Sequence, residues 1–170
     1  MKKVIVIGCP GSGKSTFARA LAEKTGLPLY YLDMMYWNAD KTKVPRELFL
    51  QRLESALAED EWIIDGNFGS TMEWRMNLCD TVFFLDYPVD VCLSGIRERR
   101  GKPREDMPWF EAENEVDEEF LSFIEAYRAE SRPHVLELLQ KYGAKDIFIF
   151  KSREEAAAYL SGNSSLQRVL

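Results

Sequence analysis

The sequence predicts an α/β fold in which a parallel β-sheet carries helices on both of its faces. Short apolar segments, rich in β-branched and aromatic residues, alternate along the chain with segments of helical periodicity. A glycine-rich loop joins the first apolar segment directly to the first helical one. Parallel strands need crossover helices, and these helices cover both faces of the sheet. With 170 residues, the chain is expected to form one domain, residues 1–170, with a sizeable core.

Five apolar segments are the expected strands: Lys2–Ile7, Leu29–Leu32, Trp62–Ile64, Thr81–Leu85 and Ile147–Phe150. Helical spacing of apolar residues and Pro or Ser start signals predict the helices. They are placed near 14–25, after 45, within 70–78 as a helix or a loop, over 89–100, around 116–127, after 133 and after 152. The strands end near Gly8, Asp33, Asp65 and Asp86. A ligand site is therefore predicted at the carboxyl edge of the sheet.

The loop after the first strand is the most specific motif. It reads Gly8, Cys9, Pro10, Gly11, Ser12, Gly13, Lys14, Ser15 and Thr16, which is the G-x-x-x-x-G-K-S pattern of a P-loop. Glycines let the backbone curl around a polyphosphate, and the following helix directs its positive end at the same anion. Lys14 is expected to reach the β- and γ-phosphates of ATP, and the Ser15 hydroxyl is expected to hold Mg²⁺.

The composition argues against several other functions. The net charge is −6, which disfavours a protein that coats nucleic acid or an anionic membrane, and no apolar run approaches the ~18 residues of a membrane span. The three cysteines form no C-x-x-C pair, which is typical of reduced thiols. The single histidine, His134, argues against His-based triads and zinc sites. We expect a cytoplasmic protein, monomeric by default, that binds no nucleic acid directly.

Two of the acidic residues at strand ends have different interpretations. Asp65 follows Trp62–Ile64 and is assigned to the metal, because a second strand of a P-loop protein supplies an Asp that holds a water molecule on Mg²⁺. An Asp-Gly turn at the same place is compatible with this role. Asp86 stands before Tyr87 and Pro88 and is interpreted as a structural residue at a turn.

Asp33 is the candidate for the phosphate-acceptor side of the site. It ends the second expected strand and is followed by Met34, Met35, Tyr36 and Trp37. A hydroxyl that accepts phosphate loses a proton, and a carboxylate at this edge could accept or orient that proton. The aromatic side chains could hold a ring or a sugar by stacking and apolar contact. The alternative is a capping Asp beside an ordinary hydrophobic cluster.

Basic residues crowd one short stretch: Arg97, Arg99, Arg100, Lys102 and Arg104. An acidic run follows, and glycine and proline interrupt the stretch, so a lid near residues 97–119 is expected to close over the phosphates. A solvated charged face explains the same composition equally well. Arg128 and Arg132 are four residues apart in the next helical pattern, so they are expected to share a face, either toward the same phosphate or toward solvent.

These residues together resemble the adenylate kinase-like branch of P-loop kinases, and more closely the bacterial proteins filed as DNA topology modulation proteins. The similarity covers nearly the whole chain, and only the loop is specific by itself. The segments that carry it are Gly8–Thr16, Tyr31–Asp33, Trp62–Phe68, Asp80–Pro88, Arg97–Arg104 and the pair Arg128 and Arg132.

The resemblance implies a three-layer P-loop NTPase fold, with a five-stranded parallel sheet in the order 2-3-1-4-5, that binds ATP and Mg²⁺ and transfers phosphate. It implies that Arg97 and Arg100 flank ATP and that the chain near Lys151 and Ser152 passes the adenine. On this reading the catalytic residues are Lys14, Asp33, Arg100 and Arg128, Arg97 joins the loop Gly8–Thr16 in binding nucleotide, and Ser15 and Asp65 serve the metal.

One departure from the adenylate kinase pattern concerns the acceptor. Adenylate kinases carry Asp-Gly-Phe-Pro-Arg after strand three, with the Arg on the acceptor phosphate. This chain has Asp65-Gly66-Asn67-Phe68-Gly69, and its next arginine is Arg75. Asp33 instead resembles the acceptor-side Asp of small-molecule kinases such as shikimate kinase.

Three functional hypotheses follow. The first is an ATP-dependent kinase that phosphorylates a hydroxyl of a small molecule, such as a nucleoside. The second is a nucleoside monophosphate kinase in which Arg75, Arg46 or Arg52 replaces the missing arginine. The third, of another class, is a nucleotide-binding regulator of the topology modulation type with little turnover.

Overall fold

Five parallel strands form one sheet in the order β2-β3-β1-β4-β5. The computed structural model describes residues 1–109, 112 and 117–163. The strands are β1 (Lys3–Gly8), β2 (Leu29–Tyr31), β3 (Trp62–Asp65), β4 (Thr81–Leu85) and β5 (Asp146–Phe150). Strands β1, β3 and β4 are buried almost throughout, as expected for central strands covered on both sides. The predicted fold class and strand order are confirmed.

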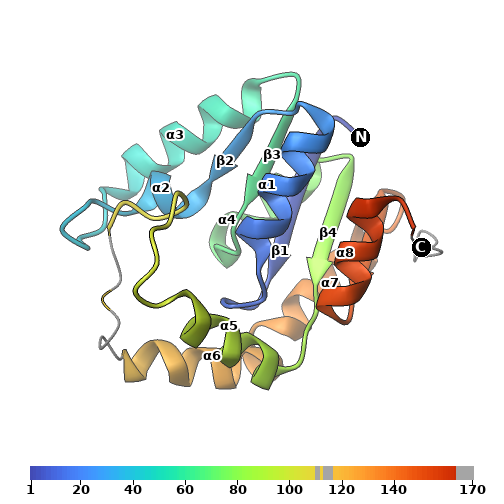
Figure 1. Ribbon diagram of the computed structural model, residues 1–170. Helices are drawn as coiled ribbons and strands as arrows, with labels where there is room; N and C mark the ends of the chain where they lie inside the picture. The colour runs from blue at the N-terminus through green and yellow to red at the C-terminus, as the bar shows by residue number, and fades with distance from the viewer. Residues whose placement is uncertain (110–111, 113–116, 164–170) are drawn as a thin grey trace.

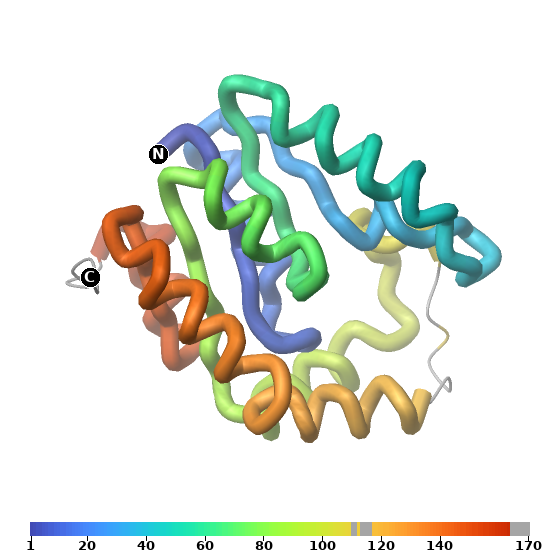
Figure 2. The backbone as a smooth tube through the Cα atoms, turned by 180° about the vertical axis from the view of Figure 1, so that it is seen from behind, coloured from blue at the N-terminus to red at the C-terminus, as the bar shows by residue number. Residues whose placement is uncertain are grey.

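Eight helices surround the sheet in the part of the chain that is described. They are α1 (Lys14–Thr25), α2 (Leu32–Tyr36), α3 (Arg46–Ala58), α4 (Gly69–Leu78), α5 (Val89–Arg99), α6 (Glu118–Glu130), α7 (Arg132–Lys141) and α8 (Arg153–Ser161). One core lies between the sheet and α3, α4 and α7, and the other lies between the sheet and α1, α5, α6 and α8. Figures 1 and 2 show these layers from opposite sides.

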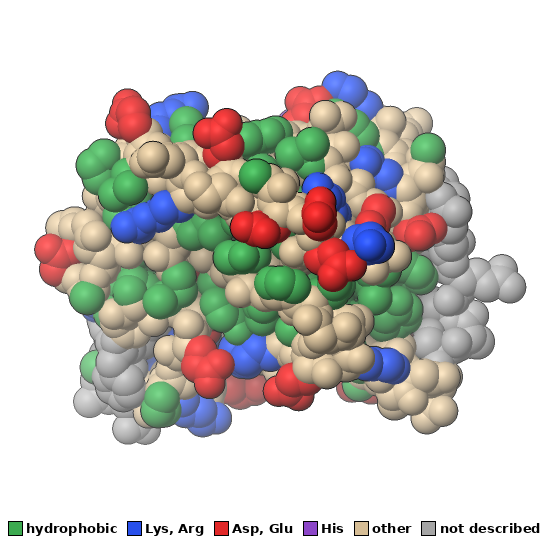
Figure 3. All heavy atoms as spheres, turned by 90° about the horizontal axis from the view of Figure 1, so that it is seen from above, with side chains coloured by type: hydrophobic (Ala, Val, Ile, Leu, Met, Phe, Trp, Pro, Cys, Tyr) green, Lys and Arg blue, Asp and Glu red, His purple; other side chains and the backbone are tan. Residues whose placement is uncertain are grey.

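Alternating side chains of β1 divide the two cores. Ile5 and Ile7 pack with Leu53 of α3 and Met76 of α4, whereas Val4 and Val6 pack on the opposite face. This is the period of two that an extended strand imposes. None of the described helices has the length and apolar character needed to cross a membrane. The face viewed in Figure 3 carries acidic and basic side chains interspersed with apolar ones.

The second strand is shorter than the sequence predicts. Pairing with β3 ends at Tyr31, opposite Asp65, and Leu32 begins the short helix α2. Asp33 therefore lies in the first turn of a helix and not at the end of a strand. The apolar residue Leu32 is fully buried in the core from this helical position, so its hydrophobicity reflects burial and not strand pairing.

Arg128 and Arg132 do not share a helix. Helix α6 ends at Glu130, and α7 begins at Arg132 with Pro133 in its first turn, where a proline is tolerated. The prediction of a common face is therefore wrong. Part of the expected lid, residues 110–111 and 113–116, and the expected frayed end of the chain from residue 164 lie outside the described residues.

Candidate active site

A cleft of about 1140 Å³ lies at the carboxyl ends of the strands. Its floor is the loop between β1 and α1, and its walls come from α2, the chain after β3, α5, residues 102–109 and α8. In Figure 1 this edge lies between α2 on one side and α5 on the other. The position agrees with the rule that open parallel sheets bind ligands beyond their carboxyl ends.

The P-loop has the backbone shape that its glycines predict. Gly11 and Gly13 have φ values of 83° and 87°, and Gly13 stands at the N-terminus of α1. A Cβ atom on Gly11 would lie 2.0 Å from the carbonyl oxygen of Cys92, so only glycine lets α5 pack against the loop. The Lys14 ammonium donates to the carbonyl oxygen of Cys9 at 3.1 Å. Residues 10–17 line the cleft.

Asn67 holds the start of the P-loop through a side-chain hydrogen bond, a role that the sequence did not predict. The Gly8 amide donates a 2.9 Å hydrogen bond to the Asn67 side-chain oxygen, across 59 residues. Asn67 also lines the cleft. The Asp-Gly-Asn sequence after β3 was the available signal, because Asn is a frequent partner of backbone groups in turns.

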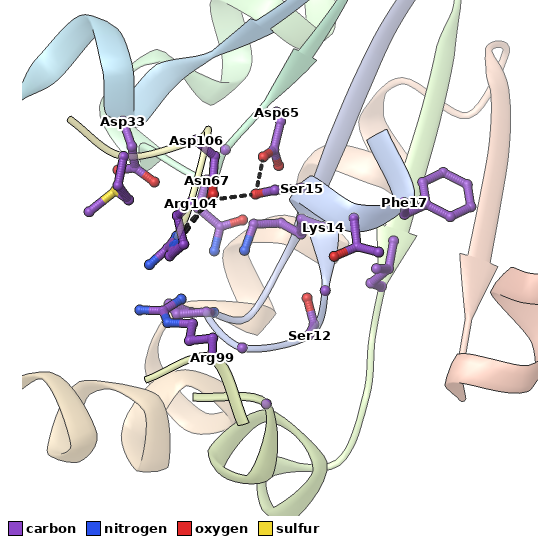
Figure 4. Close-up of a pocket in the computed structure, with 18 of the residues that line it drawn as sticks. Ser12, Lys14, Ser15, Phe17, Asp33, Asp65, Asn67, Arg99, Arg104 and Asp106 are labelled. Atoms are coloured by element: carbon purple, nitrogen blue, oxygen red, sulfur yellow. Dashed lines mark hydrogen bonds and ion pairs between the residues drawn. The ribbon is translucent and has the colours of Figure 1, made fainter. Parts of the chain in front are cut away.

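Ser15 and Asp65 meet directly. The Ser15 hydroxyl donates to Asp65 Oδ2 at 2.6 Å, as Figure 4 shows. Asp65 is 5% exposed, and its Oδ1 atom has no hydrogen-bond partner among the described residues. Burial raises the pKa of Asp65 to about 6, although the charge of Lys14 acts in the opposite direction. A buried carboxylate with an unsatisfied oxygen beside a hydroxyl is the kind of oxygen set that Mg²⁺ prefers, so the residues fit this ion.

Asp106 joins the same cluster, and no sequence signal identified it. The Ser15 hydroxyl lies 2.9 Å from Asp106 Oδ2. Arg104 holds Asp106 through two hydrogen bonds, from Nε to Oδ1 at 3.2 Å and from Nη2 to Oδ2 at 2.6 Å. Burial opposes the charge of Asp106, yet the hydrogen bonds and charge of Arg104 hold its pKa below the usual value. In the sequence Asp106 is one member of an acidic run, which reads as solvated surface.

Asp33 lies in the same cleft as the P-loop. Burial raises the pKa of Asp33, while the charges of Lys14 and Arg104 act in the opposite direction. Four aromatic residues that line the cleft form an aromatic wall, which we define as Tyr36 and Trp37 after Asp33, Phe68 after β3, and Trp109 after α5. The rings meet edge to face, with centroids 4.9 Å apart for Tyr36 and Phe68 and 5.5 Å apart for Trp37 and Trp109.

The basic stretch contributes residues other than those predicted. Arg99 and Arg104 line the cleft, and both charges act on Asp33; Figure 4 shows their side chains with Lys14. Arg97 is exposed and lies outside the lining of the cleft, and Arg100 lines a smaller cavity of about 100 Å³. Spacing explains the difference, because Arg99 continues the inward stripe of Cys92 and Ile96 on α5.

Neither arginine of the pair predicted after the lid reaches the phosphate region. Arg128 is exposed, because its neighbour Tyr127 takes the inward position on α6. Arg132 forms two hydrogen bonds with Asp86, from Nε at 2.7 Å and from Nη2 at 2.8 Å, and Lys151 also pairs with Asp86. These bonds tie α7 and the end of β5 to the end of β4. Asp86 is thus engaged in a structural contact.

Arg75 is a buried structural residue. It is 0% exposed and donates to the backbone oxygens of Gly66 at 2.9 Å and Phe68 at 3.2 Å, and also to that of Asn67. Burial lowers its pKa to about 10. Arg75 therefore shapes the chain after β3 from within the core. Two other arginines were candidates to replace the acceptor-binding arginine of adenylate kinases. Arg52 donates to the Met35 backbone oxygen, and Arg46 is exposed.

No protein-family model matches this chain, and no curated protein matches it. Solved structures do match over nearly the full length. The shikimate kinase from Bacteroides thetaiotaomicron aligns with 94% of this chain and 94% of its own, with 21% identity and a TM-score of 0.55. The shikimate kinase from Aquifex aeolicus aligns with 94% of this chain and 92% of its own, with 20% identity and a TM-score of 0.53. The chain has the fold of these P-loop kinases. At this identity the likeness concerns the fold.

Proposed function

We propose that this protein is an ATP-dependent kinase of the cytoplasm that transfers the γ-phosphoryl group to a hydroxyl of a small molecule. The observation that carries the proposal is that Asp33 and the P-loop residues line one cleft. A phosphate-binding loop alone supports nucleotide binding. A carboxylate on the opposite wall adds a group that can take a proton from an acceptor.

On the nucleotide side, the loop amides and Lys14 hold the phosphates, and Arg99 lies where it could neutralise charge on the transferred group. Ser15 and Asp65 would hold Mg²⁺, which supplies positive charge to the phosphate oxygens. The cleft continues to α8, where Arg153 and Ala156 line it, and we place the adenine at this end.

On the acceptor side, Asp33 orients the hydroxyl and accepts its proton. Its raised pKa makes it a stronger base than an exposed aspartate, which suits this role. The aromatic wall offers ring faces and edges to an apolar or planar part of the acceptor. The solved structures of similar fold are, by their names, kinases of shikimate, and a kinase of this fold with a small-molecule acceptor agrees with the proposal.

The second hypothesis, a nucleoside monophosphate kinase, loses its best candidate residue. An acceptor phosphate needs cationic side chains that hold its charge. Arg75 is committed to three backbone oxygens inside the core, and Arg52 donates to Met35. The third hypothesis, a regulator of the topology modulation type, shares the nucleotide site and differs in turnover.

A coupled assay of ADP release tests the three hypotheses together. Purified protein with ATP and Mg²⁺ is offered nucleosides, nucleoside monophosphates, sugars and shikimate-like acids. We expect release with a hydroxyl acceptor and transfer of labelled γ-phosphate to it. Turnover with monophosphates only would select the second hypothesis. Tight ATP binding without turnover on any acceptor would select the third.

A further inference from the structure

The Ser15 hydroxyl lies between two carboxylates. Its oxygen is 2.6 Å from Asp65 Oδ2 and 2.9 Å from Asp106 Oδ2. One hydroxyl carries one proton, so it can donate to only one of these two oxygens at a time. The other carboxylate oxygen then faces a lone pair at short range. The arrangement is incomplete unless a proton or a cation lies among the three oxygens.

Two further observations favour a cation. Asp65 is 5% exposed, and its Oδ1 atom lacks a hydrogen-bond partner among the residues described; a buried oxygen without a partner is costly. Asp106 is 6% exposed and forms an ion pair with Arg104, with Nη2 and Oδ2 2.6 Å apart. In the described part of the chain no three acidic, histidine or cysteine side chains gather closely enough to hold a metal alone. A cation between these residues would therefore be held by the two carboxylates and the Ser15 hydroxyl together with oxygens of water or of the nucleotide.

We propose that Asp106 is a ligand, direct or through one water molecule, of the same divalent cation that Ser15 and Asp65 would hold. The inference rests on the proposed function, because the cation enters with ATP. Asp106 belongs to residues 100–109, which connect α5 to the rest of the expected lid. Cation binding would then fasten this segment to the P-loop.

Arg104 is a positioning residue in this arrangement. Its two hydrogen bonds fix both oxygens of Asp106 and so aim the carboxylate at Ser15. A planar guanidinium holds a carboxylate in this two-point manner, whereas a lysine ammonium does not. The alternative role is inhibitory, and we call it a plug: Asp106 would occupy the place of the cation and would have to move away before the cation could bind. The two roles predict opposite signs for one measurement.

The measurement is the gain in nucleotide affinity that the metal provides. Isothermal titration gives the Kd of a non-hydrolysable ATP analogue with Mg²⁺ and again with EDTA, and the ratio of the two is the gain. If Asp106 is a ligand, Asp106→Asn reduces this gain by roughly tenfold or more and leaves the Kd in EDTA nearly unchanged. Arg104→Lys reduces the gain by less. The matched control is Glu105→Gln, which removes a charge from the exposed neighbour and keeps the gain.

Hydrogen exchange provides a second readout without catalysis. Mg²⁺ added to the analogue complex should slow exchange of amides in residues 100–109 in the wild type and in Glu105→Gln, but not in Asp106→Asn. A larger gain in Asp106→Asn would show a plug, and an unchanged gain would show no role; either result overturns the inference. Phosphoryl transfer by the wild type would leave the proposed function standing in both cases. A wild type without any metal-dependent gain also overturns the inference.

Discussion

Ser15 and Asp65, 50 residues apart in the sequence, are joined by a 2.6 Å hydrogen bond. This bond places the start of α1 against the end of β3. It brings together a hydroxyl and a carboxylate of the types that hold Mg²⁺ in P-loop proteins.

Replacement of Asp65 by Asn should therefore weaken the metal more than it disturbs the fold. The amide keeps the shape and still accepts the hydrogen bond from Ser15, but it lacks the charge. We expect the Mg²⁺ concentration for half-maximal transfer to rise by roughly 10–100-fold. Asp60→Asn, at an exposed aspartate before β3, is the control and should behave as the wild type. An unchanged Mg²⁺ dependence would remove Asp65 from the metal site.

Lys14→Ala should abolish most of the transfer. The lysine side chain lines the cleft, and its ammonium donates to the backbone oxygen of Cys9, so we expect it to stabilise the ligand more than the fold. We expect a loss on the order of 10³-fold or more in kcat/KM, while the ligand-free protein still folds. Lys24→Ala, at the exposed far end of α1, is the matched control. Wild-type nucleotide binding and turnover in Lys14→Ala would contradict the P-loop assignment.

Asp33→Asn tests the acceptor class. The substitution keeps the shape and removes the base, so transfer to a hydroxyl should fall by ~10²–10⁴-fold, while ATP affinity by titration stays nearly the same. A phosphate acceptor is already ionised near neutral pH and needs no base. Full transfer by Asp33→Asn to a monophosphate would therefore replace the first hypothesis by the second.

Asp86→Asn should lower stability in a pH-dependent way. Burial opposes the charge of Asp86, but the hydrogen bonds from Arg132 and Lys151 together outweigh it and hold the pKa below the usual value of 3.8. A lowered folded-state pKa stabilises the fold above the unfolded-state pKa, and this contribution is lost as the pH falls through the folded-state pKa. We expect a loss of about 1–3 kcal/mol at pH 7.

Urea unfolding at pH 7 and at about pH 3 checks this prediction. The difference between wild type and Asp86→Asn should shrink at the lower pH, because about pH 3 lies below the ordinary aspartate pKa of 3.8 and protonation of this carboxyl in the unfolded chain begins to remove its contribution. Asp90→Asn, at an exposed aspartate in the first turn of α5, serves as the comparison. A destabilisation that is equal at both pH values would mean that the ion pairs with Arg132 and Lys151 contribute little.

The sequence was sufficient to predict those features of the structure that depend on residues close together in the chain. The alternation of apolar segments with helical periodicity predicted a parallel α/β sheet. The motif Gly8–Thr16 predicted a phosphate-binding loop at the N-terminus of a helix, and the structure has this shape at Gly11 and Gly13. The inward position of Arg99 could also have been predicted, since Arg99 continues the helical spacing of the buried residues Cys92 and Ile96.

Prediction failed where a segment depends on distant partners. The strand Leu29–Tyr31 stops where its pairing with β3 runs out at Asp65, and the apolar residue Leu32 does not reveal this limit. Arg104 lies between α5 and α6, where no helical periodicity indicates the direction of its side chain, and only the packing of this segment brings it to the cleft. Arg132 was expected to face either a phosphate or solvent, yet it binds Asp86, 46 residues away.

The sequence by itself determined the periodicity, the order of elements and the phosphate-binding motif, because these depend on residues that are close in the chain. Tertiary structure alone decided the contacts of side chains that meet across the cleft. Asp106 is 91 residues from Ser15 and belongs to an acidic run, so no local pattern sets it apart from a solvated charge. Packing of the chain after α5 over the P-loop brings it to the hydroxyl, and that packing depends on the whole fold.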